Sequence, residues 1–170
     1  MGKGRKRISC KKSYYSNYKR KNKGGLLRMK IYLDNCCFNR PFDDQTQLKI
    51  YLESQAKLFI QHKIISKEYK LVWSFILEYE NGQNPYEIRK DTIIKWKSLA
   101  SEIIIQNEEI IKFAETLNTM GIKSKDALHV ACAAFSNCDY FITTDKKLLN
   151  LKIKEVKISS PIDFVIEMEG

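Results

Sequence analysis

The chain lacks any apolar run that approaches the roughly 20 residues of a membrane-spanning helix. Its N-terminal segment also lacks the apolar core, about 7 to 15 residues long, of a secretory signal. No CxxC pair is present and the five cysteines are an odd number, so neither a disulfide framework nor a zinc site is predicted. We therefore expect a cytoplasmic protein without membrane contact, with reduced thiols that act mainly as small buried apolar groups.

Acidic residues are missing from the start of the chain. Residues 1–30 contain 12 Lys or Arg and no Asp or Glu, whereas residues 31–170 contain the other 18 bases and all 20 acids. Residues 1–28 also show no hydrophobic period, and their Lys, Ser, Asn and Gly content is typical of a disordered segment. This basic leader is either a dispensable extension or an RNA contact, with tyrosines at 14, 15 and 18 available for stacking.

Short apolar strands alternate with helices over residues 29–170, which suit one domain. This alternation predicts an α/β fold, a three-layer α/β/α sandwich with a central parallel sheet of four or five strands. Right-handed crossovers put the carboxyl ends of all strands on one edge. Strands are expected at 29–33, 69–73, 139–143 and 156–159, while 102–105 is either a strand or an extended connector.

A long helix is predicted to begin after Asp44 and to end near His62. Asp44 is its expected N-cap, with Gln47 at the capping-box position. Its expected buried face has a 3.6-residue spacing and consists of Leu48, Tyr51, Leu52, Gln55, Phe59 and Ile60. Later helices are expected to begin after the caps Asn84, Asn107 and Ser124, and at Lys146 and Pro161.

Three aspartates are placed to meet at one edge of this sheet. Asp34 ends the first strand, Asp145 follows the strand at 139–143, and Asp126 lies in the first turn of a helix. Taken singly, each has an ordinary explanation, because Asp is common in turns, at helix caps and near helix N-termini. Together they form an acidic cluster whose mutual repulsion favours a hard divalent cation, Mg²⁺ or Mn²⁺.

Such a site could hydrolyse a phosphodiester bond. Lysines and an arginine close in sequence to the acids, Arg40, Lys123, Lys125, Lys146 and Lys147, are candidate phosphate contacts for an RNA substrate. Asn35 either contacts phosphate or braces the loop after Asp34. His129, three residues after Asp126, is either a ligand or proton shuttle or, more commonly for a His in this setting, a packed residue that satisfies a backbone group.

The chain resembles the PIN-domain ribonuclease family, including toxins of the VapC type. The matching motifs are IYLD at Ile31–Asp34, the acid-bearing segment Ser74–Glu80, DALHVA at Asp126–Ala131 and FITTD at Phe141–Asp145. The resemblance implies an endoribonuclease, a hydrolase of RNA with Asp34, Asp126 and Asp145 as ligands of Mg²⁺ or Mn²⁺, and Thr143 orienting a carboxylate or water.

The fourth acid implied by the resemblance is either Glu80 or Glu78. These residues cannot share one helix face, since they are about 200° apart, and the spacing from Ser74 favours Glu80. The resemblance further implies a toxin–antitoxin pair, with a small antitoxin protein as partner and a homodimer as assembly. A PIN nuclease of RNA processing, without an antitoxin, is the alternative within the family.

Two rivals belong to other classes of protein. A non-catalytic RNA-binding module would rely on residues 1–28, so that deleting them would abolish RNA affinity. A phosphatase-like or receiver-like domain would use Asp34 as a nucleophile. The first strand lacks the DxDxT pattern of the phosphatase and the paired acids of the receiver, which argues against both.

Overall fold

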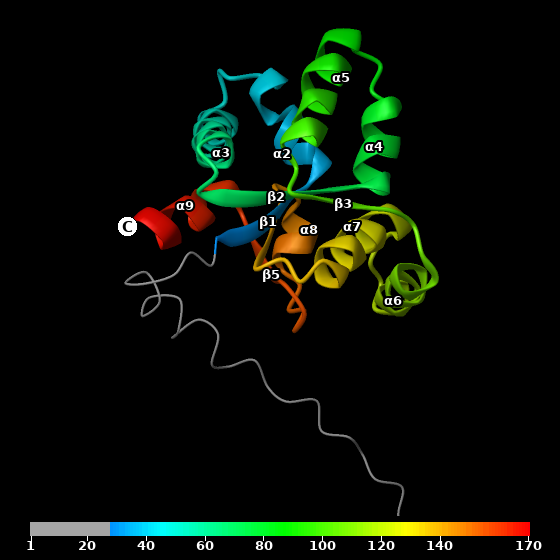
Figure 1. Cartoon of the computed structure of the whole chain (residues 1–170). Coiled ribbons are helices and arrows are strands. Elements are labelled where there is room, and N and C mark those ends of the chain that lie inside the picture. The colour runs from blue at the N-terminus through cyan, green and yellow to red at the C-terminus, as the bar shows by residue number, and fades with distance from the viewer. Residues whose placement is uncertain (1–27) are drawn as a thin grey trace, which may run out of the picture.

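The computed structural model describes residues 28–170 and is built around a five-stranded parallel sheet with the order β3-β2-β1-β4-β5 (Figure 1). The predicted parallel α/β/α sandwich is therefore confirmed, and the ambiguous segment at 102–105 forms an edge strand. The predicted basic leader lies outside the described residues, except for Arg28. The strands are β1 (Met29–Leu33), β2 (Tyr69–Ser74), β3 (Glu102–Ile104), β4 (Tyr140–Ile142) and β5 (Lys157–Ser159).

Helices cover both faces of the sheet (Figure 1). On one face lie α2 (Asn35–Asn39), α3 (Leu48–Ile65) and α5 (Glu87–Ile94), and α9 (Pro161–Glu169) packs beside α3. The opposite face carries α6 (Glu108–Thr119) and α7 (Ser124–Phe135). The helices α4 (Phe75–Gly82) and α8 (Lys146–Leu149) follow β2 and β4, and two 3₁₀ helices span Arg40–Phe42 and Lys95–Leu99. In the described part of the chain, no helix is long and apolar enough to cross a membrane.

The central strands are buried on both faces, as expected for a parallel sheet between helical layers. Tyr32 and Trp73 are both fully buried but face opposite layers. Tyr32 stacks on Phe141 and contacts His129 of α7, whereas Trp73 packs edge-on against Phe38 of α2. The two rings therefore fill the two halves of the core, one on each side of the sheet.

The segment after β1 differs from the prediction. Residues 35–39, expected as part of a loop, form α2, because Asp34 caps this helix by accepting a hydrogen bond from the backbone N–H of Asn35. Asp44 is not a helix cap. Its carboxylate accepts from the backbone and hydroxyl of Thr46 and closes a turn, so α3 begins only at Leu48 and then runs to Ile65.

Two other helix starts also differ from the prediction. The helix α7 has Lys123 as its N-cap and Ser124 as its first residue, rather than Ser124 as the cap. The helix α5 begins at Glu87, because the side chain of Asn84 accepts from the backbone of Tyr86 and forms a turn of its own. The predicted cap Asn107 is confirmed by its bond to the backbone of Ile110.

The predicted buried face of α3 is wrong by half a turn. Of the six residues expected inside, only Ile60 is buried, and the others point outward. The inner face is instead largely polar: Glu53, Ser54, Lys57 and Gln61 are buried together with Ile60 and Ile64. This inversion follows from the polar groups that α3 meets, since Arg40 lies 3.0 Å from Glu53 and its backbone carbonyl accepts from Ser54.

Lys57 is an unusual member of this inner face. It is 4% exposed, and its ammonium lies 5.5 Å from the centre of the Phe38 ring and 6.0 Å from that of Trp96. Burial lowers the pKa of Lys57 to about 8. The cation–π contacts compensate only part of the cost of burying the charge.

We expect Lys57→Met to stabilise the protein at pH 7 by roughly 1–3 kcal/mol, because the cost of the buried charge disappears. The folded pKa lies below the unfolded value, so between pH 8 and about 10.5 the unfolded chain binds more protons. The free energy of unfolding of the native protein should therefore increase as pH rises through this window. The Lys57→Met variant should lack this increase. Urea unfolding across this pH range, with the exposed Lys70→Met as control, measures both effects. Equal pH slopes in the two variants would contradict this account of Lys57.

Candidate active site

Asp34 is held at the carboxyl end of β1 by hydrogen bonds on both carboxylate oxygens. Its Oδ1 accepts from the backbone N–H of Asn35 at 2.7 Å. Its Oδ2 accepts from the Thr143 hydroxyl at 2.7 Å and from the Cys36 thiol at 3.2 Å. Its own N–H donates to the carbonyl of Ile142 at 2.9 Å, which ties it to β4. The side chain is 7% exposed, so its orientation is fixed by the fold.

Thr143 connects Asp34 to the next acid. It is fully buried just after β4, and its hydroxyl, which donates to Asp34, also accepts from the backbone N–H of Asp145 at 3.1 Å. Asp145 caps α8, since its Oδ1 accepts from the N–H groups of Lys147 and Leu148. Its Oδ2 has no hydrogen-bond partner within residues 28–170, which leaves one oxygen for a ligand.

Glu80 comes to the site from α4 and pairs with His129 of α7. The Nε2 of His129 lies 2.8 Å from Glu80 Oε2, and its Nδ1 lies 2.7 Å from the hydroxyl of Tyr32. Tyr32 lies 2.5 Å from the hydroxyl of Ser74, the N-cap of α4. His129 is 1% exposed, so this chain of polar groups runs from the site into the core.

Proton positions along this chain follow from the pKa shifts of Glu80 and Tyr32. Burial raises the pKa of Glu80, but the hydrogen bond and charge of His129 outweigh it, and the net shift is downward. An ionised Glu80 accepts, so His129 donates from Nε2 and, when neutral, accepts at Nδ1 from Tyr32. Burial raises the pKa of Tyr32 well above its usual value, which keeps that proton in place. With His129 neutral, Tyr32 in turn accepts from Ser74, and both hydroxyls point toward Glu80.

Asp126 lies in the first turn of α7 and is half-buried. Burial raises its pKa, and the negative charges of Asp34, Asp145 and Glu80 raise it further, against a smaller opposing effect of His129. Asp126 therefore lies within electrostatic reach of the three other acids. One potential ligand atom from each of Asp34, Glu80 and His129 lies within 4.8 Å of the others.

The donor set fits a hard divalent cation. Asp34 and Glu80 offer carboxylate oxygens that lie within 4.8 Å of each other, and the negative charges of Asp34, Asp145 and Glu80 act on the nearby Asp126, whose pKa is raised. Oxygen donors of this kind suit Mg²⁺ or Mn²⁺. Asp34, Asp126, Asp145 and Glu80 are the residues that would hold the ion, whereas the two ring nitrogens of His129 already have partners.

Several other predicted site residues are placed elsewhere. Glu78 is exposed and forms an ion pair with Lys97 at 2.8 Å, so it is Glu80 that faces the acids. The guanidinium of Arg40 is occupied by Glu53 at 3.0 Å and Asp43 at 3.1 Å, which gives it a structural role.

The remaining residues predicted to contact phosphate are Asn35 and the lysines close in sequence to the acids. The side-chain oxygen of Asn35 accepts from Asn39, so Asn35 braces α2. Lys123, Lys125 and Lys146 are exposed, and the ammonium of Lys125 lies 5.6 Å from the centre of the Tyr79 ring.

Sequence reasoning missed three residues that support the site. Cys36 donates to Asp34 and accepts from the backbone N–H of Thr144 at 3.4 Å, although it was expected to be a passive thiol. Tyr32 was not considered as a partner of His129, nor Ser74 as a partner of Tyr32. Their positions in adjacent strands, facing the same layer as α7, were available from strand alternation.

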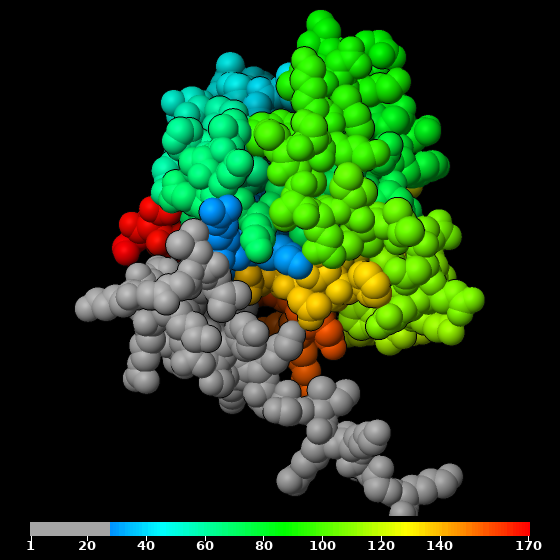
Figure 2. Space-filling model, viewed as in Figure 1, coloured from blue at the N-terminus to red at the C-terminus, as the bar shows by residue number. Residues whose placement is uncertain are grey.

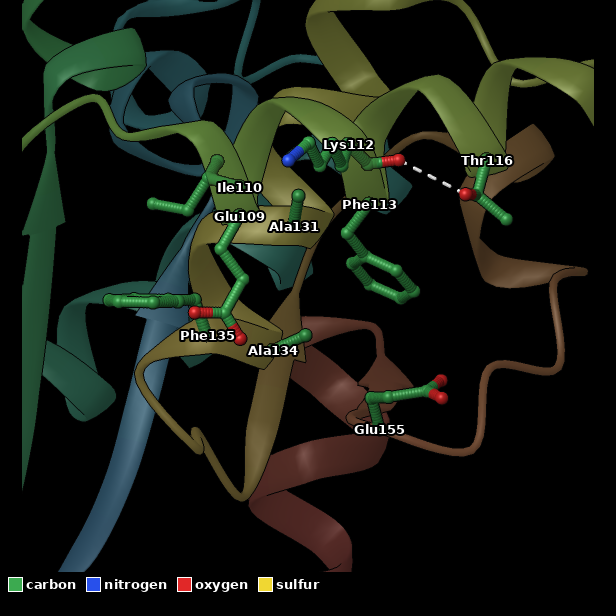
Figure 3. A pocket seen from close by; sticks show the side chains of 9 residues that line it. All are labelled: Glu109, Ile110, Lys112, Phe113, Thr116, Ala131, Ala134, Phe135 and Glu155. Atoms are coloured by element: carbon green, nitrogen blue, oxygen red, sulfur yellow. Dashed lines mark hydrogen bonds between the residues drawn. The ribbon is translucent and has the colours of Figure 1, made fainter. Parts of the chain in front are cut away.

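A separate pocket lies at the junction of α6 and α7 and shares no residue with the acidic cluster (Figure 3). Its volume is about 430 Å³, and its walls are mainly apolar, with Phe113 and Phe135 prominent. Glu109 and Glu155 also line it (Figure 3). The acids at the sheet edge therefore form a site distinct from this cavity.

No family profile and no curated protein matches this chain. Among solved structures, a chain of the VapBC2 complex from Rickettsia felis, bound to a DNA fragment from its promoter, has a TM-score of 0.51 and 16% identity and covers 78% of this chain and 98% of that chain. A chain of VapBC-1 from nontypeable Haemophilus influenzae has a TM-score of 0.46 and 22% identity, with the same coverage. The second likeness carries no weight, and the first shows the fold alone. The protein thus has a VapC-like PIN-domain fold.

Proposed function

We propose that the protein is a metal-dependent endoribonuclease that hydrolyses RNA phosphodiester bonds. The observation that carries the proposal is the group of acids around Asp34: an oxygen of Glu80 lies within 4.8 Å of it, Thr143 bonds both Asp34 and the backbone of Asp145, and the charges of these three acids raise the pKa of Asp126. On this fold, four carboxylates at one sheet edge are best explained as ligands of Mg²⁺ or Mn²⁺.

The protein's own residues would divide the work as follows. Asp34 and Asp145, oriented by Thr143 and α8, offer fixed carboxylate oxygens to the ion. Glu80 is kept ionised and aimed by His129, and it would accept a proton from an attacking water. When bound, the divalent ion supplies charge that polarises the scissile phosphate and lowers the pKa of that water. Lys123, Lys125 and Lys146 are exposed cations that would bind flanking phosphates.

We further propose that this nuclease is the toxin of a toxin–antitoxin pair. A solved structure that shares its fold is a VapBC complex, which supports a small antitoxin protein as partner. A homodimer is the expected assembly, and the cytoplasm is the proposed location, because the cysteines of residues 28–170 are free thiols. An RNA-processing nuclease would have the same chemistry without such a partner.

Replacing a central acid should abolish catalysis without unfolding the protein. We expect Asp34→Asn and Asp126→Asn each to reduce Mg²⁺- or Mn²⁺-dependent RNA cleavage by at least about a hundredfold, because each removes a charged ligand. Asp126→Asn should also raise the melting temperature in metal-free buffer, since it relieves repulsion among the acids. Cleavage of a fluorescent RNA and thermal unfolding with a chelator measure the two effects.

The matched control for these variants is Glu78→Gln, which removes an exposed acid of α4 that is paired with Lys97. It should cleave RNA like the native protein. Metal-dependent cleavage that survives in Asp34→Asn and Asp126→Asn would sink the nuclease proposal. Removal of residues 1–28 tests the RNA-binding rival, because a nuclease retains cleavage and a leader-dependent binding module loses its RNA.

Two substitutions of His129 should separate its two hydrogen bonds. In His129→Gln the amide nitrogen reaches the place of Nε2 and still donates to Glu80, whereas in His129→Asn the side chain reaches only Tyr32. We expect Asn to weaken Mn²⁺ affinity and kcat by about 10- to 100-fold with little change in KM, and Gln to retain more of both. Stability should show the opposite order, because Gln leaves the buried Tyr32 hydroxyl without its acceptor. Titration calorimetry, steady-state kinetics and urea unfolding provide the readouts; equal losses in both variants would contradict the assignment.

Expression of the native chain in a bacterial host should arrest growth if the protein is a toxin. Asp34→Asn should be expressed without arrest, because the proposed toxicity requires the acid cluster. Co-expression of a small protein encoded next to the toxin should restore growth and co-purify with it. Growth arrest is followed by optical density after induction. Unimpaired growth, together with active cleavage in vitro, would favour the RNA-processing alternative.

A further inference from the structure

Tyr79 and Lys125 form a pair of side chains beside the acidic cluster. Tyr79 precedes Glu80 on α4, and Lys125 precedes Asp126 on α7. Consecutive residues of a helix point about 100° apart, so a residue next to an acid of the site lies at the rim of that site. The helices α4 and α7 pack against each other (Figure 1), and the Lys125 ammonium lies 5.6 Å from the centre of the Tyr79 ring. We call these two residues the rim pair.

The charge of Lys125 gives independent evidence that the rim pair borders the acids. Burial acts to raise the pKa of Glu80, whereas His129 and, to a smaller degree, Lys125 lower it. An electrostatic effect of this kind falls off with distance, so the Lys125 ammonium lies close to the Glu80 carboxylate as well as to the Tyr79 ring. The rim pair is therefore next to the place where a phosphate of the substrate would meet the acids.

The Tyr79 side chain is open to solvent at this rim. It is 55% exposed, and its hydroxyl forms no hydrogen bond within residues 28–170. In Figure 2, the segment that includes α4 and α5 forms the upper right surface of the molecule. A flat ligand can therefore stack on the part of the ring that Lys125 does not contact. A nucleobase is such a ligand, because every base has a π-face.

Lys125 supplies a positive charge that is not used by the fold. It is exposed and forms no ion pair with a carboxylate of residues 28–170. The cation of a comparable pair is not free in this way: the guanidinium of Arg89 lies 4.5 Å from the centre of the Tyr86 ring, but it also donates to the Phe42 carbonyl. The Lys125 ammonium can therefore bind a phosphate while the ring beside it holds the base of the same nucleotide.

We propose that Tyr79 is a base-stacking residue of the RNA site: the nucleobase beside the scissile phosphate lies on its ring, and Lys125 binds the phosphate of that nucleotide. This inference rests on the proposed nuclease function and deepens it, because it assigns residues that position the RNA next to the acids. Stacking on an aromatic ring tolerates any base. The rim pair therefore holds the strand in place without selecting its sequence.

Steady-state cleavage of a short single-stranded RNA by the full chain tests the role of the ring. Tyr79→Ala should raise KM by about 5- to 100-fold, the effect of losing one stacked base, and leave kcat within about twofold. Tyr79→Phe keeps the ring and should retain the native KM. Tyr51→Ala removes an exposed tyrosine from α3 and is the matched control. A native KM in Tyr79→Ala, or an equal rise in Tyr79→Phe, would overturn the proposal.

The two members of the rim pair should differ in how they change the salt dependence of RNA binding. Lys125→Gln removes one phosphate contact, so the slope of log Kd against log salt should fall by about 0.7, the value of one contact to a single strand. Tyr79→Ala should weaken binding and leave the slope unchanged, because the ring carries no charge. Fluorescence anisotropy of a labelled RNA measures Kd, with Asp34→Asn as the common background so that the RNA stays intact. Equal slopes in the two variants would contradict the assigned roles.

Stacking itself is measured with an RNA that carries 2-aminopurine, whose fluorescence falls when the base stacks. With the analogue placed at each position in turn, binding to Asp34→Asn should quench the position next to the bond that the native chain cleaves. Adding Tyr79→Ala should abolish this quenching. Quenching that persists without the ring, or a native chain that binds no RNA, would overturn the proposal. Quenching that depends on Tyr79, in a protein whose native form cleaves no RNA, would instead refute the nuclease proposal alone.

Discussion

Four carboxylates at one edge of the sheet repel one another, and the local structure has to compensate for this repulsion. Three of the acids are held by donors: Asp34 by Thr143, Cys36 and a backbone N–H, Asp145 by the N-terminus of α8, and Glu80 by His129. Asp126 has no such donor within residues 28–170, and its pKa is the one that rises. The parallel pairing of β1 with β4 brings Asp34 and Thr143 together, so the sheet topology itself organises the cluster.

The sequence predicted the sheet well because strands give local signals. Short apolar runs that end in Asp or Thr locate strand ends, and parallel topology places those ends together. The inner face of α3 could not be predicted in the same way. Periodicity identifies the apolar face of a helix. Whether that face packs inside the chain or lies at its surface depends on the residues that the helix packs against. Here Arg40 and the backbone around it require polar neighbours, and Glu53 and Ser54 supply them.

The RPFDD segment after β1 therefore has a role that its sequence did not reveal. Arg40 pairs with Glu53 and Asp43, while Arg89 of α5 stacks on Phe42 and donates to its carbonyl. These contacts join the 3₁₀ helix at Arg40–Phe42 to α3 and α5 through charged groups, in addition to the apolar core of the layer. Buried ion pairs of this kind add little to net stability, but losing one partner is costly. Arrangements of the helices that separate these pairs are therefore disfavoured.

The buried chain from Ser74 through Tyr32 to His129 has a consequence for observing the protein in solution. Hydroxyl protons normally exchange with water too quickly to be detected, but those of Tyr32 and Ser74 are enclosed in the core and engaged in short hydrogen bonds. They should give resolved proton resonances far downfield in the NMR spectrum. Because every bond in the chain points toward Glu80, the positions of these resonances would report the charge at the acidic cluster from inside the fold, without any label.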